Sequence, residues 1–467
     1  ACLIGLCIFG IRGRTGYNPI KVSAAYFCQD AFLNQLGVSP TFNLLTSVMD
    51  DMRPENKYLH LMDEQEAITK AQALLNRPGD ANVSPLAVYR HAAKADSVQQ
   101  RRPNVVLIMM ESMSAEFMKH FGQSETLTPF LDSLYTRSIS FRNFYSAGIH
   151  TNHGLYATLY SFPAMMKRNL MKGSVIPRYS GLPTVLKENG YYNLFFMTHE
   201  GQYDNMNAFF RTNGYDEVFS QEDYPVDKVV NSFGVQDDFL YDYAIPVLNQ
   251  RAATGQPFFA TLLSISNHPP YVIPPFFHPK TSEPETQIVE YADWALRQFF
   301  EEARKQPWFD NTIFVLEGDH GKLVGDAECE LPESYNHIPL MIYSSRIQPE
   351  EKTAFGGQVD IQPTILGLLN IDYLQNNFGV DLLKEERPCM FYTADNMVVG
   401  RNDTLLYLYN YETQQELTYD IGNGKLNAVP MDDSFFPLKE YSFSMLQSAE
   451  FLVKHGKTLN SIPFTQQ

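Results

Sequence analysis

The sequence predicts an α/β fold with a mostly parallel central sheet flanked by helices. From Pro103 onward, short continuous apolar runs alternate with amphipathic stretches, which is the pattern of parallel strands buried on both faces and joined by helices. Several of these runs end in polar residues, as expected where the carboxyl ends of such strands form a binding crevice. The expected strands are 104–110, 192–198, 258–266, 312–318 and 338–344, and the expected helices are 128–138, 152–160, 181–190, 289–305 and 359–370.

The chain divides into three parts. Residues 1–102 begin with an apolar run that is too short to span a bilayer, since a spanning helix needs about 20 apolar residues. We interpret this part as the outer end of a truncated transmembrane helix followed by a helical stalk. A buried helix or a signal-peptide remnant are the alternatives for the apolar run. Residues 103–382 form the main α/β domain, and residues 383–467 predict a small α+β appendage, because strand-like alternation is followed there by an amphipathic helix.

The composition excludes some classes of protein. The formal net charge of −17 argues against a nucleic-acid-binding surface and against electrostatic docking on anionic lipid. The five cysteines form no Cys-x-x-Cys pair and no zinc-ribbon spacing, so they predict neither a structural zinc site nor a disulfide framework. In particular, we expect no disulfide among Cys28, Cys329 and Cys389.

The residues that end the expected strands are of the types that bind metal ions. Glu111 follows the first strand, His199 the second, His268 closely follows the third, and Asp319 and His320 follow the fourth. Any one of these could be a helix cap or a turn residue, but the ends of four parallel strands converge on one crevice. Carboxylate oxygens with a histidine nitrogen suit Mn²⁺, Zn²⁺ or Mg²⁺. We therefore expect a metal site that contains Glu111, Asp319 and His320.

Thr151 is the candidate nucleophile. It follows Gly148, which allows a tight turn, and it precedes the expected helix 152–160, whose free N–H groups can hold an anion. A threonine hydroxyl is a poor nucleophile unless a metal or a base lowers its proton affinity, and the expected metal site would meet this condition. The alternative is that Thr151 is an ordinary N-cap.

Five motifs carry a resemblance to a known family. NVVLIMMES, the Gly-x-x-Thr of GIHT, SISNHPPY, EGDHG and VDIQPT occur in this order between Pro103 and Leu382. In order and spacing they resemble the lipoteichoic acid synthase branch of the sulfatase and alkaline phosphatase superfamily. The upstream stretch GIRGRTGYNPIKVSAAYF resembles the segment that follows the transmembrane helices of these enzymes. The resemblance implies a sulfatase-like catalytic domain at 103–382 and a membrane protein whose N-terminal helices are missing from this chain.

The resemblance also implies a reaction and the roles of its residues. Glu111, Thr151, Asp319 and His320 would bind one divalent metal ion, commonly Mn²⁺ or Mg²⁺. Thr151 would form a covalent phospho-substituted intermediate, and His268 would contact the phosphate or protonate the leaving group. The reaction would transfer a phospho-linked head group, phosphoglycerol in well-known members, from a phospholipid donor to a glycan or polyol acceptor. The catalytic domain would face the extracytoplasmic side of the cell membrane.

The chain departs from this family near the donor phosphate. Phosphoglycerol transferases of the family carry a Trp and an Arg there, whereas this chain has Asp204, Asn205 and Met206. His199, Asp204 and Asn205 are therefore the candidate substrate contacts beside His268, and phosphoethanolamine is an alternative head group. A phosphodiesterase, phosphatase or sulfatase-like hydrolase could use the same site, although HTNHG is not the Cys/Ser-x-Pro-x-Arg nucleophile motif of a sulfatase. An inactive binding module is disfavoured, because every residue that the chemistry requires is present.

Overall fold

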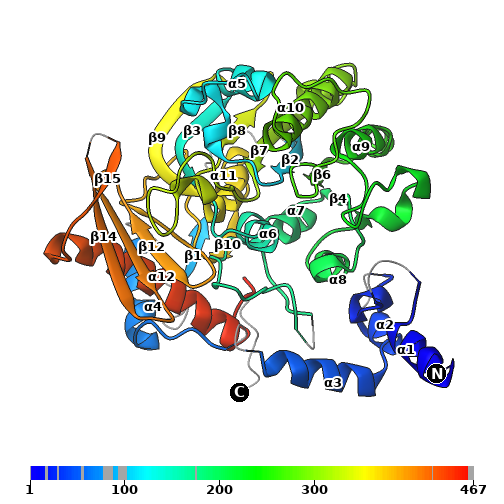
Figure 1. Ribbon diagram of the computed structural model, residues 1–467, viewed down its shortest axis with the longest axis horizontal. Coiled ribbons are helices and arrows are strands. Elements are labelled where there is room, and N and C mark those ends of the chain that lie inside the picture. Colours follow the sequence, from blue (N-terminus) through cyan, green and yellow to red (C-terminus); the bar gives the residue numbers. More distant parts are fainter. Residues whose placement is uncertain are drawn as a thin grey trace.

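The computed structural model describes residues 2–15, 19–28, 31–53, 57–76, 88–92, 102–173, 176–422 and 424–460. Residues 77–87 and 93–101 of the expected stalk lie outside the described residues. The described chain contains an eight-stranded sheet between two layers of helices, a five-stranded antiparallel sheet and a two-stranded ladder (Figure 1).

The eight-stranded sheet has the strand order β5-β4-β6-β2-β7-β8-β3-β9. Only β8 runs against its neighbours, since it pairs antiparallel with both β7 and β3. The mostly parallel sheet predicted from the sequence is confirmed, and all five expected strands are present. The strands are β2 (Asn104–Met110), β3 (Ile139–Tyr145), β4 (Tyr192–Met197), β5 (Glu217–Phe219), β6 (Phe258–Leu263), β7 (Thr312–Gly318), β8 (Leu340–Tyr343) and β9 (Glu350–Gly357).

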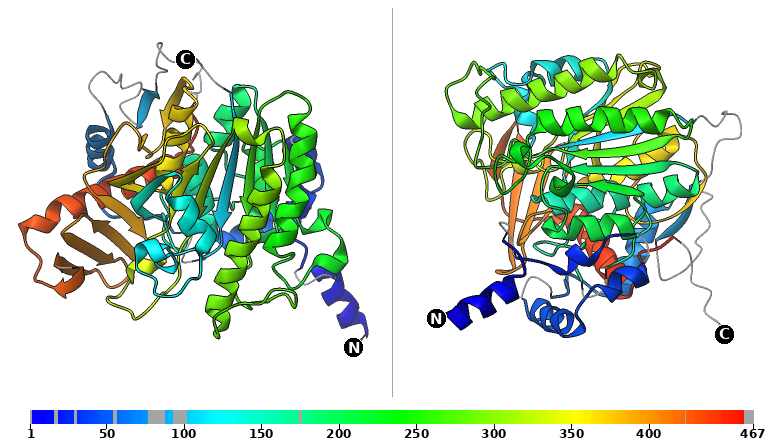
Figure 2. Two further views of the ribbon diagram at one scale, coloured as in Figure 1. Left: turned by 90° about the horizontal axis from the view of Figure 1, so that it is seen from above. Right: turned by 90° about the vertical axis from the view of Figure 1, so that its right-hand side faces the viewer.

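The central strands are continuous apolar runs because helices cover both faces of the sheet. Every residue of β2, β6 and β7 is buried. Val105 and Leu107 of β2 pack in one hydrophobic cluster, and Val106 and Ile108 pack in another on the opposite face, as the alternation of side chains along a strand requires. The first cluster includes α6 (Thr151–Tyr160), α7 (Leu182–Glu188), α8 (Met206–Thr212) and α11 (Ile361–Leu368), and the second includes α5 (Pro129–Tyr135), α9 (Asp237–Ala252) and α10 (Pro284–Ala303) (Figure 2).

The carboxyl-terminal part is the predicted α+β appendage. Its antiparallel sheet consists of β11 (Met390–Thr393), β12 (Met397–Arg401), β13 (Leu405–Asn410), β14 (Gln415–Gly422) and β15 (Lys425–Ala428), in this order, and it packs against α12 (Phe436–Lys454).

Part of the expected stalk packs on this appendage. Helix α4 (Glu64–Leu75) lies along α12, where Lys70 pairs with Glu440 at 2.7 Å and Lys454 with Glu64 at 2.8 Å. The strand β1 (Tyr89–Ala92) pairs with β10 (Tyr373–Asn376). Helix α4 and strand β1 of the expected stalk therefore contact the rest of the protein. The domain boundaries at residues 102 and 382 stay a prediction.

The first described residues form α1 (Cys2–Arg12), the 3-10 helix η1 (Val22–Ala25), α2 (Ala31–Leu36) and α3 (Pro40–Asp51). In Figure 1 these elements, drawn in blue, lie along the lower edge, outside the helical layers of the main sheet. None of the described helices combines the length and the apolar character that crossing a membrane requires. Cys28, Cys329 and Cys389 carry free thiols.

Candidate active site at the carboxyl ends of the strands

A cleft of about 380 Å³ lies at the carboxyl ends of the central strands. Its volume falls within the range usual for small-molecule sites. Residues from several separate segments line it, among them Glu111, Thr151, Asp204, His268, His320 and Lys322. The convergence expected from the strand ends is therefore present in the structure.

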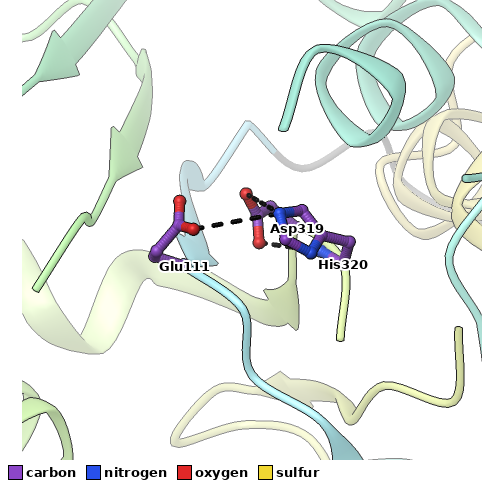
Figure 3. A group of neighbouring side chains, drawn as sticks. All are labelled: Glu111, Asp319 and His320. Carbon is purple, nitrogen blue, oxygen red and sulfur yellow. Dashed lines mark hydrogen bonds and ion pairs between the residues drawn. The ribbon is translucent and has the colours of Figure 1, made fainter. Parts of the chain in front are cut away.

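Three of the predicted metal ligands lie together at this cleft. One donor atom each from Glu111, Asp319 and His320 falls within a group whose members are all within 4.8 Å of one another (Figure 3). His320 Nε2 is 3.8 Å from Glu111 Oε1 and 3.7 Å from Asp319 Oδ2. These residues meet because β2 and β7 are adjacent parallel strands that end at the same level, with Met110 opposite Gly318.

Neighbouring groups orient the three side chains. The Ser112 hydroxyl donates to Glu111 Oε1 at 2.8 Å, and the Ser112 N–H donates to Asp319 Oδ1, also at 2.8 Å. His320 Nδ1 lies 2.8 Å from the carbonyl oxygen of Gly321, which can only accept, so Nδ1 carries the hydrogen. The lone pair of the neutral ring is therefore on Nε2, the nitrogen that faces the two carboxylates. This is how metal-binding histidines are usually oriented.

The group fits a divalent cation. Asp319 is completely buried, yet its Oδ2 atom accepts no hydrogen bond from any described residue. Burial, together with the negative charge of Asp319, raises the pKa of Glu111 well above its ordinary value. Two buried carboxylates side by side need a positive charge to remain ionised, and two oxygens with one nitrogen suit Mn²⁺, Zn²⁺ or Mg²⁺.

Thr151 stands beside this group. It is the first residue of α6, and its hydroxyl donates to Glu111 Oε2 at 3.5 Å. The cap position belongs to His150, so the alternative of Thr151 as an ordinary N-cap is not what the structure has. Helix α6 packs closely on the loop after β7: a Cβ on Gly154 would lie 2.3 Å from the carbonyl oxygen of Asp319. Because Gly154 has no side chain, α6 can approach this loop closely and place Thr151 beside Glu111.

The sequence did not single out Gln358, which links two loops beside the cleft. This buried side chain accepts a hydrogen bond from the Ala147 N–H at 2.9 Å and donates to the carbonyl oxygens of Gly318 and Asp319 at 3.1 and 2.8 Å. It thereby connects the segment before Thr151 with the loop that carries Asp319. The only signal in the sequence was its place beside the VDIQPT motif.

His268 lines the cleft from the loop after β6. Its ring packs on Phe233 with 4.0 Å between centroids, and its Nδ1 lies 2.6 Å from the carbonyl oxygen of Pro269. Burial lowers the pKa of His268 below its ordinary value. The ring is therefore fixed in orientation while it remains in contact with the cleft.

The other three predicted substrate contacts, Asp204, His199 and Asn205, do not lie together in the cleft. Asp204 lines the cleft, where it accepts from Asn152 at 3.3 Å and pairs with Lys172 at 2.9 Å. His199 is buried against Tyr203, and burial lowers its pKa to about 4. Asn205 donates to the carbonyl oxygen of Met171 and lines a different pocket. Only Asp204 among these three is part of the cleft wall.

Lys322 is a second residue that the sequence did not single out. It lines the cleft, and its Nζ donates to Asn267 Oδ1 at 2.6 Å and to the Tyr271 hydroxyl at 3.3 Å. Burial lowers the pKa of Lys322 to about 8. It places a positive charge within reach of an anionic substrate, two residues beyond His320.

A mostly parallel sheet with two carboxylates, a histidine and a hydroxyl at its carboxyl edge is the arrangement of an alkaline-phosphatase-type enzyme. The sequence profile of the sulfatase family matches residues 103–371, and the chain belongs to this family. It is thus an enzyme of the sulfatase superfamily.

Curated relatives include lipoteichoic acid synthase 2 of Bacillus subtilis, 24% identical over 61% of this chain and 47% of that protein. Lipoteichoic acid synthase of Staphylococcus saprophyticus is 24% identical over 71% of this chain and 54% of the relative. The chain spans about half the length of these relatives.

Two solved structures are similar in fold. A protein of the alkaline phosphatase superfamily from Vibrio parahaemolyticus has a TM-score of 0.76 and 26% identity, and the match covers 86% of this chain and 98% of that one. The lipoteichoic acid synthase LtaP from Listeria monocytogenes has a TM-score of 0.66 and 21% identity, over 76% of this chain and 93% of that one. The resemblance to the lipoteichoic acid synthase branch noted in the sequence is confirmed.

Proposed function

We propose that this chain transfers a phospho-linked head group, of the phosphoglycerol type, from a phospholipid to a glycan or polyol acceptor through a covalent intermediate on Thr151. The observation that carries the proposal is the position of the Thr151 hydroxyl, 3.5 Å from Glu111 in the cleft that also holds His320. The names of the relatives, lipoteichoic acid synthases, support this class of substrates. The reaction takes place at a cell membrane, on its extracytoplasmic side.

In this proposal Glu111, Thr151, Asp319 and His320 hold one divalent ion, Mn²⁺ or Mg²⁺, with Zn²⁺ as a third possibility. When bound, such an ion lowers the proton affinity of the hydroxyl and offsets the charge that develops on the phosphoryl group. The amino terminus of α6 adds N–H groups on the same side as Thr151.

In the first half-reaction, Thr151 Oγ1 bonds to the donor phosphorus while the bond from phosphorus to the diacylglycerol oxygen breaks. The Thr151 proton passes to water in the cleft, and protonated His268 gives its proton to the departing oxygen. In the second half-reaction, an acceptor hydroxyl returns a proton to His268 and its oxygen bonds to phosphorus. The bond to Thr151 then breaks, and Oγ1 takes a proton back from water in the cleft. Water in place of the acceptor would make the enzyme a phosphodiesterase.

The head group is a separate question, and one observation favours a second candidate. Asp204 presents a carboxylate to the cleft, which suits a cationic group such as the ammonium of phosphoethanolamine. Its pairing with Lys172 partly neutralises that carboxylate, and Lys322 contributes a cation nearby. We therefore keep phosphoglycerol as the first candidate and phosphoethanolamine as the second. His199 and Asn205 do not line the cleft, so in this proposal they support its wall and do not contact the substrate.

The test is an intact-mass measurement on the Mn²⁺-loaded protein after incubation with vesicles of phosphatidylglycerol or of phosphatidylethanolamine. We expect a covalent adduct whose mass identifies the head group, and no adduct on Thr151→Ala. Diacylglycerol release without any adduct, at an equal rate in Thr151→Ala, would replace the covalent mechanism by attack of water. No adduct and no diacylglycerol from either donor would favour an inactive binding module.

A further inference from the structure

The turn 202–205 carries Tyr203 and Asp204 to the wall of the catalytic cleft, and part of its backbone has a positive φ. The φ angle is 46° at Asp204 and 66° at Asn205, in the left-handed region that residues with a side chain seldom adopt. This conformation is unfavourable for such residues, so it persists only where surrounding contacts hold it. The contacts of the turn therefore decide where the Asp204 carboxylate lies in the cleft.

An N-terminal segment contacts this turn. We call it the strap and define it as the described residues 14, 15 and 19–26. Its carboxyl end is anchored in the core, because Tyr26 is buried in the first hydrophobic cluster and η1 packs against α8, at the lower right of Figure 1. The strap belongs to the part of the chain expected to form a stalk, yet it is fixed on the helical layer of the main sheet.

Gln202, the first residue of the turn, joins the turn to the strap. Its buried side chain accepts from the N–H of Lys21 at 3.0 Å and donates to the carbonyl oxygen of Pro19 at 3.3 Å. It also donates to Glu200 Oε2 at 3.0 Å. Both the oxygen and the nitrogen of this amide are thus hydrogen-bonded, and the backbone of the strap provides two of the three partners.

The strap also holds residues on either side of the turn. Arg14 Nη2 lies 2.5 Å from Oε1 of Glu200, whose side chain is 8% exposed. The Asn207 side chain donates to the carbonyl oxygen of Tyr26 at 2.9 Å. A buried carboxylate or amide that loses its partner is unfavourable. Removal of the strap contacts therefore favours a turn that moves until water reaches these groups.

We propose that the strap positions the turn 202–205, and with it Asp204, for binding of the donor head group. Arg14, Glu200 and Gln202 are the positioning residues. This inference rests on the proposed function, in which the Asp204 carboxylate faces the head group. None of the three positioning residues is among the described residues that line the cleft, so they act on the substrate only through the turn. The strap is then a part of the donor site.

The first experiment is steady-state kinetics of the Mn²⁺-loaded whole chain on phosphatidylglycerol dispersed in detergent, with diacylglycerol release as the signal. Gln202→Ala should raise KM about tenfold and leave kcat within about threefold of the wild type, because the lost hydrogen bonds place a binding residue and take no part in the chemical step. Arg14→Ala should raise KM less. Arg14→Lys can keep the ion pair with Glu200 and should return KM towards the wild-type value.

The matched control is Gln447→Ala. The buried Gln447 of α12 accepts from the N–H of Leu61 at 2.7 Å and donates to the carbonyl oxygen of Leu59 at 3.3 Å, so it ties another part of residues 1–102 to the rest of the chain. It is not among the described residues that line the cleft. Its loss should lower the free energy of unfolding, measured in urea, and leave KM unchanged.

Two measurements do not depend on turnover. Hydrogen exchange followed by mass spectrometry should be about tenfold faster in Gln202→Ala than in the wild type for the hydrogen-bonded amides between 203 and 207, and unchanged in Gln447→Ala. Titration calorimetry of the Mn²⁺-loaded wild type with glycerol phosphate and with phosphoethanolamine should give a Kd for one of them that rises about tenfold in Gln202→Ala, as KM does.

Several results would overturn the proposal. A wild-type KM in Gln202→Ala, or unchanged exchange of the turn, would show that the strap does not position it. A lower kcat at constant KM, as expected when fewer molecules remain folded, would assign the strap to stability alone. If Gln202→Ala does not fold, the Arg14 variants decide, and a wild-type KM in Arg14→Ala would be the contrary result.

Failure of the proposed reaction gives a different set of results. If the wild type releases no diacylglycerol from phosphatidylglycerol or phosphatidylethanolamine, the reaction is wrong, whereas hydrogen exchange and calorimetry still decide the role of the strap. A wild type that binds neither glycerol phosphate nor phosphoethanolamine would overturn the role of the strap in head-group binding.

Discussion

The hydroxyl of Thr151 lies 3.5 Å from the carboxylate of Glu111, although the two residues belong to different elements. Glu111 directly follows β2, and Thr151 begins α6. The nucleophile candidate is thus held by the same group of residues that would hold the metal ion. Because the cap of α6 is His150, a substitution of Thr151 can test its role in catalysis without removing the helix cap.

Thr151→Ala should abolish head-group transfer, by several orders of magnitude, while it changes the free energy of unfolding by less than about 1 kcal/mol, because the cap of α6 is His150. Thr151→Ser retains a hydroxyl and should keep measurable turnover. Diacylglycerol release from lipid vesicles and urea denaturation provide the two measurements. Near-wild-type turnover of the alanine variant would exclude Thr151 as the nucleophile.

Glu111→Gln should stabilise the metal-free protein. Burial and the negative charge of Asp319 raise the pKa of Glu111 in the folded protein. The contribution of Glu111 to the free energy of unfolding is therefore complete below its unfolded pKa, and it is lost as the pH rises through the folded pKa. At pH 8 the glutamine removes this penalty, and the free energy of unfolding should rise by on the order of 1 kcal/mol. The same variant should lose the increase in melting temperature that Mn²⁺ gives the wild type. Thermal denaturation in EDTA and in Mn²⁺ tests both effects, and an unchanged Mn²⁺ response would contradict the ligand assignment.

Lys322→Met should lower kcat/KM for an anionic phospholipid by about 10- to 100-fold, since a charge-assisted hydrogen bond is worth roughly 1.5–3 kcal/mol. Lys322→Arg keeps the charge near Asn267 and Tyr271 and should lose less. The measurement is steady-state kinetics over a range of donor concentrations. Equal losses in the two variants would indicate a packing role in place of a contact with the donor.

His337→Gln should destabilise the fold in a pH-dependent way. The structure places His337 Nδ1 and Nε2 each 2.8 Å from an acceptor, Glu116 Oε1 and the carbonyl oxygen of Arg142. Both nitrogens must then donate, so the ring is positively charged. Burial alone would lower the pKa of His337, but the Glu116 carboxylate outweighs it and the pKa is raised above 6.5.

Because the folded pKa of His337 is raised, its contribution is complete below pH 6.5 and is lost as the pH rises through the folded value. The variant should cost about 1–3 kcal/mol at pH 6 and clearly less at pH 9. Urea denaturation of both proteins at the two pH values measures the difference. A cost that does not change with pH would mean that the ring is neutral.

The sequence predicted the strands of the middle of the sheet and missed strands near its edge. The runs at β2, β6 and β7 are entirely apolar because each is covered on both faces. By contrast, β3 contains the exposed Arg142, and the edge strand β9 begins with the exposed Glu350 and Glu351. Edge strands are often charged on the side that faces water, so their composition resembles that of a loop.

By itself, the sequence predicted that Glu111, Asp319 and His320 lie together, because each follows an apolar strand, and parallel strands end at a common edge. Only the tertiary structure decided which other side chains join them. Gln358 and Lys322 act through contacts with residues distant in the chain, and no local pattern marks such contacts. The pairing of Lys172 with Asp204 is the same case, because these two residues come from separate segments of the chain. A net charge sums over the whole chain, whereas binding depends on the charges that folding brings to one place.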